Sequence, residues 1–82
     1  MENLATHDAF LHVYDANADA IFRHCYLRIW NRDRAKELMQ ETFLKTWKYL
    51  ENGHEVENIR AFLYRTATNL IKADTSKTTD NY

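Results

Sequence analysis

The sequence lacks proline, and it holds a single glycine, Gly53, and a single cysteine, Cys25. Tight hairpin turns usually need glycine or proline, so this shortage argues against a β fold with many strands. One cysteine cannot form a disulfide within the chain, which removes the signature of a small secreted scaffold. A chain of 82 residues suits one domain with a modest core. We therefore expect an all-α bundle.

Two further absences concern membranes and charge. No apolar run approaches the ~20 residues that a membrane-spanning helix needs. The first ten residues, "MENLATHDAF", have no basic segment followed by an apolar one, as a signal peptide would. We therefore expect no membrane association and a location in the reducing cytoplasm. The net charge is −1, so any nucleic-acid binding must depend on local cations and on help from a partner.

Apolar residues recur at three- and four-residue spacing in four segments, which predicts a compact bundle of about four helices. The segments lie at about 6–15, 17–30 and 33–51, and the last begins at about residue 58. Between the first two, "DANAD" (15–19) offers capping residues but no glycine or proline, so a turn and a mere bend both fit. Gly53 is placed to end the third helix, and Asn58 to cap the fourth. We expect the domain to span 1–72, followed by a polar, frayed tail at 73–82.

The third segment has two different faces. Its inward stripe consists of apolar residues and one threonine: Ala35, Met39, Phe43, Thr46, Trp47 and Leu50. At 100° per residue, the opposite side carries a strip of polar residues around one leucine: Glu37, Gln40, Glu41, Leu44 and Lys48. Single exposed apolar residues are normal, so a solvated face is one interpretation. The other is a protein-docking strip with an apolar anchor inside a polar rim.

The fourth segment has cations and hydrogen-bonding groups away from its buried side. They are Arg60, Tyr64, Arg65, Asn69 and Lys72. Such a set can follow phosphates and stack on bases. Scattered cations are equally ordinary on a solvated helix, so the pattern alone leaves both interpretations open.

Metal and catalytic sites are not predicted. His24 adjoins Cys25, but neighbours on a helix point about 100° apart and do not converge on one ion. The other histidines show no zinc spacing. No nucleophile with its base can be identified, and no glycine-rich loop is present to hold phosphate. We expect no metal, no cofactor and no enzymatic activity.

Two motifs together are more specific: "DRAKELMQETFLKTWKYL" and "NIRAFLYRTATNLI". They resemble region 2 of the extracytoplasmic-function (ECF) group of bacterial sigma factors. That pattern is roughly Ala-Glu-Asp-Leu-Val-Gln-Glu-Thr-Phe-Leu-Arg-x-Trp, then about ten residues, then Asn-x-x-Ala-Trp-Leu-Tyr-x-x-Ala-x-Asn. The matching residues are Ala35, Leu38, Gln40, Glu41, Thr42, Phe43, Leu44 and Trp47 in the first motif. In the second they are Asn58, Ala61, Leu63, Tyr64, Ala67 and Asn69. The resemblance covers roughly residues 8–72.

The resemblance implies a helical domain that gives RNA polymerase its promoter choice. The helix at 33–50 would dock on the β′ clamp helices of the polymerase core through Glu37, Gln40, Glu41, Leu44 and Lys48. The following loop and helix would recognise and melt the promoter minus-ten element and hold its non-template strand. The DNA-binding residues would be Asn52, Asn58, Arg60, Tyr64, Arg65, Asn69 and Lys72.

This chain departs from the family pattern in several places. Lys36 stands where an acidic residue is usual, and Phe62 stands where tryptophan is usual. The segment after Asn69 is nearly neutral rather than basic. The 82 residues contain no region 4 helix-turn-helix, so we expect the domain alone not to be a full initiation factor. The alternative function is a sigma-like interaction domain, an anti-sigma target or a decoy, without promoter binding of its own. An anti-sigma factor is a possible partner in either case.

Overall fold

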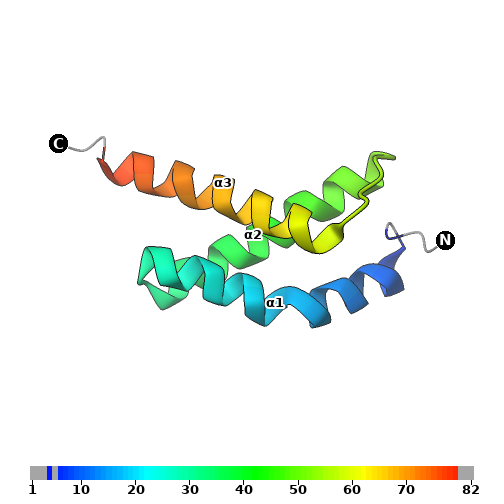
Figure 1. Ribbon diagram of the computed structural model, residues 1–82, viewed down its shortest axis with the longest axis horizontal. Helices are drawn as coiled ribbons and strands as arrows, with labels where there is room; N and C mark the ends of the chain where they lie inside the picture. The colour runs from blue at the N-terminus through cyan, green and yellow to red at the C-terminus, as the bar shows by residue number, and fades with distance from the viewer. Residues whose placement is uncertain (1–3, 5, 80–82) are drawn as a thin grey trace.

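Three helices make up most of the part of the chain that the structure, a computed structural model, describes: residue 4 and residues 6–79. They are α1 (His7–Ile29), α2 (Arg32–Glu51) and α3 (Ile59–Thr79). Each helix packs on the other two, and the molecule measures 48 × 22 × 17 Å. The start of α1 and the α2–α3 loop lie at one end of the long axis, and the α1–α2 turn lies at the other (Figure 1). The all-α class is confirmed.

The expectation of about four helices was wrong, because α1 runs without a break through the segment "DANAD". Asn17, in the middle of that segment, is buried, and its Nδ2 donates to the Val13 carbonyl at 2.9 Å. Its Oδ1 accepts a hydrogen bond from Nη1 of Arg60 on α3 at 2.9 Å. The amide that looked like a helix stop thus has both polar ends satisfied inside the bundle, so the helix continues past it.

The α1–α2 turn uses caps instead of glycine. Trp30 ends α1 in the left-handed conformation with φ 60°, and its backbone N–H donates to the Tyr26 carbonyl. Bulky residues seldom adopt this conformation, which glycine usually supplies at a helix end. Asn31 then caps α2, because its Oδ1 accepts from the Arg34 backbone N–H at 2.9 Å.

The core forms where the three helices meet. Ile21 and Cys25 from α1, Leu38 from α2 and Leu63 from α3 are essentially inaccessible to solvent. Between the first half of α1 and the second half of α2, aromatic rings pack against each other, as in the edge contact of Tyr14 with Phe43 at 4.8 Å. The expected inward stripe of α2 is therefore the buried one, although Trp47 is only partly covered.

Two buried threonines on α2 show how a polar group is accommodated in this core. The Thr42 hydroxyl donates to the Leu38 carbonyl at 2.7 Å, and the Thr46 hydroxyl donates to the Thr42 carbonyl at 2.8 Å. Each donor therefore finds a partner one turn back along its own helix. Thr42 can therefore lie buried at the helix interface without leaving its hydroxyl unsatisfied.

Helix α3 begins after the α2–α3 loop and runs past residue 72 to Thr79. An ion pair holds part of this extension: Arg34 Nη2 and Nε lie 2.6 and 2.9 Å from Asp74 Oδ1. The proposed division into a domain at 1–72 and a tail at 73–82 remains a prediction, and residues 80–82 lie outside the described part. Among the described helices, none is long and apolar enough to cross a membrane.

Candidate functional site

The strip on α2 lies opposite the core, as its spacing predicts. Leu44, at its centre, has an exposed fraction of 51%. It lines a shallow surface hollow of about 480 Å³, together with Gln40, Glu41, Lys45 and Lys48. The strip is therefore an apolar side chain within a ring of polar ones, three of which were expected there.

Two residues differ from the expected strip. Glu37 does not line the hollow, and its Oε1 pairs instead with Nη1 of Arg34 at 2.9 Å on the helix surface. Lys45 does line the hollow, although it was not among the expected residues. It directly follows Leu44, and a lysine side chain is long enough to reach sideways from its own position on the helix. In the sequence, only its adjacency to Leu44 indicated that Lys45 could line this hollow.

The α2–α3 loop is held against α2 by aromatic stacking. The rings of Tyr49 and His54 lie 4.2 Å apart at 15°, and Tyr49 also stacks on Phe62 of α3 at 4.9 Å. Gly53 supplies the reversal at φ 90°. Asn52 is the exposed C-cap of α2. Sequence reasoning did not identify Tyr49 and His54 as the residues that fix this loop, because the stack depends on where α3 lies.

A second hollow, of about 320 Å³, lies beside this loop at the start of α3. Its lining includes two of the expected DNA-binding residues, Asn58 and Arg65, and two carboxylates, Glu55 and Glu57. Asn58 also caps α3, since its Oδ1 accepts from the Ala61 backbone N–H at 3.0 Å. Its side-chain oxygen is therefore engaged in the cap, and the amide NH₂ is the donor left for a ligand.

Arg60 and Tyr64 form a unit on the side of α3 that faces α1. The Arg60 guanidinium carbon lies 5.3 Å from the centre of the Tyr64 ring, and Arg60 also binds Asn17. The Tyr64 ring also makes a T-shaped contact with the His24 ring of α1, with centroids 5.0 Å apart and planes 81° apart. A base that stacks on the Arg60 side of Tyr64 has to displace the guanidinium.

His24 is part of this α1–α3 contact. Its Nε2 lies 3.0 Å from the Thr68 hydroxyl, and its Nδ1 lies 3.3 Å from Arg28 Nη1. Partial burial, and then the Arg28 charge, lower the pKa of His24. No group of three or more metal-ligating side chains converges anywhere in the described residues.

The remaining expected DNA-binding residues, Asn69 and Lys72, are exposed on α3. From Asn58 to Lys72 the helix rises about 21 Å, at 1.5 Å per residue. The set is thus spread along the whole first part of α3 rather than gathered in one pocket. This arrangement suits a ligand that is itself extended.

Comparison with known proteins assigns this helical domain to a family. The model of Sigma-70 region 2 matches residues 13–79. The chain belongs to the Sigma-70 region 2 family, which is not a class of enzymes.

The similar curated proteins are ECF RNA polymerase sigma factors, which confirms the predicted resemblance to region 2 of that group. The chain is 32% identical over 63 residues to SigW of Bacillus subtilis, covering 77% of this chain and 34% of the relative. It is 32% identical over 65 residues to BldN of Streptomyces coelicolor, covering 78% and 25%. For SigG of Mycobacterium tuberculosis the identity is 37% over 49 residues, covering 60% and 13%. The chain thus spans about a third or less of these relatives, and no solved structure matches it significantly.

Proposed function

We propose that this domain is the region 2 module of an ECF sigma factor, acting in the cytoplasm in transcription initiation. In this role it docks on the β′ clamp helices of the RNA polymerase core and recognises and melts the promoter minus-ten element. The observation that carries the proposal is the half-exposed Leu44 inside a polar rim, on the α2 motif that resembles the family pattern.

The docking role follows from what α2 leaves uncovered. Full burial of a leucine contributes about 1.5–3 kcal/mol, so covering the exposed half of Leu44 contributes roughly 1 kcal/mol. Gln40, Glu41 and Lys48 supply hydrogen bonds and charge around it, which set the register of a partner helix. Glu37 extends the same strip by one turn, and Arg34 holds its carboxylate in place.

Leu44→Asp tests the docking role against a purified fragment carrying the β′ clamp helices. The change removes the apolar anchor and places an unpaired carboxylate in the contact, so affinity should fall at least about 100-fold. Leu11→Asp is the matched control, because Leu11 is exposed to 47% on α1, away from the strip. Both variants should keep the helical circular dichroism of the parent. Equal affinity of parent and Leu44→Asp would refute the docking role.

The DNA role is supported by the chemistry along α3. Arg65 and Lys72 are exposed cations that can bind phosphates, while Asn52 and Asn58 offer amides beside the loop. Tyr64 offers a ring face worth about 1–3 kcal/mol per stacked base, less the cost of moving Arg60. Glu51, Glu55 and Glu57 repel phosphates at this end, so binding by the domain alone should be weak and salt-sensitive.

Selection from a pool of randomised single strands, with polymerase core and the domain together, tests the DNA role. We expect enrichment of a short motif, and extrusion of one of its bases, which costs a few kcal/mol of stacking. Arg65→Ala and Lys72→Ala should each weaken all strands alike and reduce the salt slope by about one. Asn58→Asp keeps the helix cap but removes the amide NH₂, so it should change the preferred motif while the fold survives. A pool that stays random would count against minus-ten recognition.

The acidic loop also keeps the second candidate open, an interaction domain whose main ligand is an anti-sigma factor. Binding of a protein partner with no DNA affinity, even with polymerase present, would favour this second function. The two candidates share the strip around Leu44 but differ in whether Arg65 and Lys72 matter.

A further inference from the structure

The outer side of α1 remains exposed within the described part of the chain. In Figure 1, α2 and α3 both lie on one side of α1, and its opposite side is open. Near the end of the helix this region carries three exposed large apolar residues, Tyr26, Leu27 and Trp30, of which Leu27 is exposed to 65%. Several large apolar residues gathered in one place, unlike a single one, are typical of an interaction site.

Trp30 adds a second observation, because its conformation is unfavourable and its ring buries little. It adopts the left-handed conformation with φ 60° and is the most exposed of the large apolar residues described. Its indole Nε1 donates to the Leu27 carbonyl at 2.8 Å, which holds the ring against the end of α1. A bulky residue kept in an unfavourable conformation without stabilising the fold indicates a contact outside the chain.

The outer face of α1 changes from small to large residues along its length. At 100° per residue, Ala16, Ala20, Arg23 and Leu27 fall within about 60° of one another, on the side away from the buried residues of this helix. Both alanines lie in the first part of the face, and the two long side chains lie in the second part. From Ala16 to Leu27 the face is about 16 Å long, or three turns.

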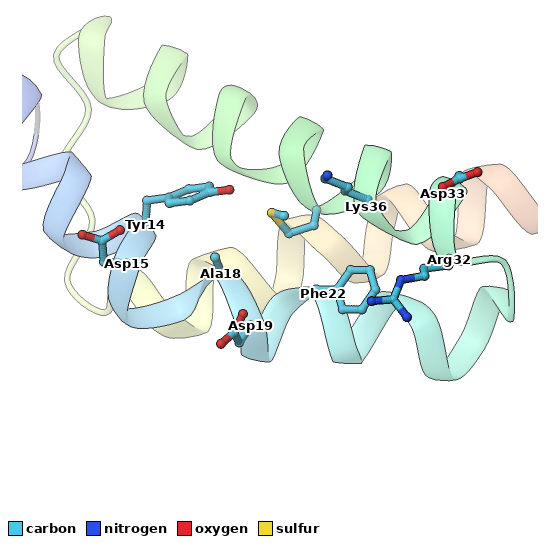
Figure 2. Close-up of a pocket in the computed structure, with 9 residues that line it drawn as sticks. Tyr14, Asp15, Ala18, Asp19, Phe22, Arg32, Asp33 and Lys36 are labelled. Atoms are coloured by element: carbon cyan, nitrogen blue, oxygen red, sulfur yellow. The ribbon is translucent and has the colours of Figure 1, made fainter.

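The face also carries one charge of each sign. Asp19 and Arg23 are exposed one turn apart, and within the described residues neither takes part in an ion pair. In Figure 2, Tyr14 points toward α2, whereas Asp19 lies farther from that helix, at the border between the α1–α2 groove and the outer side of α1. The face is therefore neutral and holds both members of a salt bridge.

We propose that this face pairs with the same face of a second copy of the chain, with the two α1 helices antiparallel about a two-fold axis beside residues 21–22. In this register Leu27 of one copy lies opposite Ala16 of the other. Arg23 lies opposite Ala20 in the same way. Each large side chain thus meets a small one, which lets the two helices approach closely.

The charges select the antiparallel direction. Asp19 comes beside Arg23 of the second copy, and the two-fold axis makes this ion pair twice. A parallel pair places Arg23 beside Arg23 and Asp19 beside Asp19, which is unfavourable. Trp30, at the end of the same face, comes beside the exposed His12 of the second copy.

A second copy fits this face better than a ligand with charge of one sign, such as a nucleic acid, whose phosphates would face Asp19. No complementary partner has to be assumed, because the face is complementary to itself. The strip around Leu44 lies on α2 and shares no residue with this face. The pairing therefore leaves the proposed contact with the polymerase clamp free.

Sedimentation equilibrium of the whole 82-residue chain measures the pairing at protein concentrations up to about 1 mM. We expect a monomer–dimer equilibrium with Kd of roughly 0.1–1 mM, since one helix pair is a small interface. Arg23→Asp alone and Asp19→Arg alone should each raise Kd at least about tenfold, because each brings like charges together at both symmetric contacts. An equimolar mixture of these two variants should form a heterodimer at least as tight as the parent dimer. A parent that is monomeric at the highest concentration, or a mixture that stays monomeric, would overturn the proposal.

Leucine variants locate the contact. Leu27→Asp should abolish the dimer, because it removes the apolar residue that packs on Ala16. Leu11→Asp is the matched control, since Leu11 is an exposed leucine on another face of α1. It should leave Kd within about twofold of the parent, as should Leu44→Asp on α2. All three side chains are exposed, so the variants should keep the parent circular dichroism. A dimer that survives Leu27→Asp, or one that is lost with Leu44→Asp, would place the contact elsewhere and refute this pairing.

Distances between two nitroxides, measured by electron–electron double resonance, give the direction. One label is attached to each copy through Asp8→Cys, with Cys25→Ala removing the native thiol. In the antiparallel pair the labels lie about 40 Å apart, from about 27 residues at 1.5 Å each. In a parallel pair they lie side by side, within about 20 Å. A distribution centred on the shorter distance would overturn the antiparallel arrangement.

Discussion

The bond between Asn17 and Arg60 joins the middle of α1 to the start of α3, and its removal should measurably destabilise the bundle. Asn17 is buried, and its amide donates to the Val13 carbonyl and accepts from Arg60, each at 2.9 Å. The Asn17→Ala substitution removes both hydrogen bonds. Arg60 is exposed and regains water, so the loss is smaller than for a fully buried pair.

The expected magnitude follows from these bonds and from helix propensity. Two hydrogen bonds at about 1 kcal/mol or less each give a loss of roughly 1.5–2 kcal/mol. Alanine is favoured over asparagine in a helix by about 0.5 kcal/mol, which offsets part of that loss. We expect Asn17→Ala to lower the free energy of unfolding by about 1–1.5 kcal/mol and Tm by roughly 4–12 °C.

Urea unfolding monitored by circular dichroism gives the free energies. A cycle of Asn17→Ala, Arg60→Ala and the double variant should return a coupling energy of about 0.5–1 kcal/mol, which separates this bond from the Arg60–Tyr64 contact. Asn69→Ala is the matched control, since it removes an exposed amide from α3 and should be neutral or slightly stabilising. If Asn17→Ala has the same free energy of unfolding as the parent, or if the coupling energy is zero, the account of why α1 is continuous is refuted.

Three other predictions concern single positions. Gly53→Ala should cost about 1 kcal/mol in urea unfolding: φ is +90° there, and nothing lies within 4 Å of an added Cβ, so the cost is conformational. Trp30→Gly should stabilise the fold by about 0.5–1 kcal/mol in the same assay, because the left-handed Trp30 is 81% exposed and buries little. Burial raises the pKa of the Cys25 thiol to about 11. The unfolded chain loses that proton at about pH 8.5, so stability should fall by about 1.4 kcal/mol per pH unit from about pH 9 to 11. Cys25→Ala should lack this component, and parallel slopes of the two proteins would contradict it.

Periodicity was sufficient to predict the all-α class but not the number of helices or where each begins and ends. The three-four spacing on α2 identified its buried stripe, because that helix is amphipathic along its whole length. The continuity of α1 depends on Arg60, which is 43 residues from Asn17 and invisible to local patterns. The extension of α3 likewise depends on the pair of Arg34 with Asp74, which joins residues 40 apart.

The site was predicted to different extents on its two elements. On α2, spacing alone placed Gln40, Leu44 and Lys48 on one exposed face, since the direction of a side chain from a straight helix follows from its number. On α3 the same arithmetic could not show that Arg60 is already bound or that Asn58 uses its oxygen as a cap. Contacts between helices decide which polar groups remain for a ligand, and these contacts are set by the fold.

The placement of charge bears on how a domain of net charge −1 can act on DNA in the proposed function. Glu55 and Glu57 lie beside Arg65 in the hollow at the start of α3, so a phosphate there gains little from the isolated domain. Docking through Leu44 makes the contact between α3 and the DNA strand intramolecular within the polymerase complex. The strand then meets α3 at an effective concentration in the millimolar range. A millimolar affinity for single-stranded DNA is then enough for occupancy. It follows that Leu44→Asp should abolish promoter opening even though it touches no DNA, whereas Arg65→Ala should weaken opening in a way that lower salt restores.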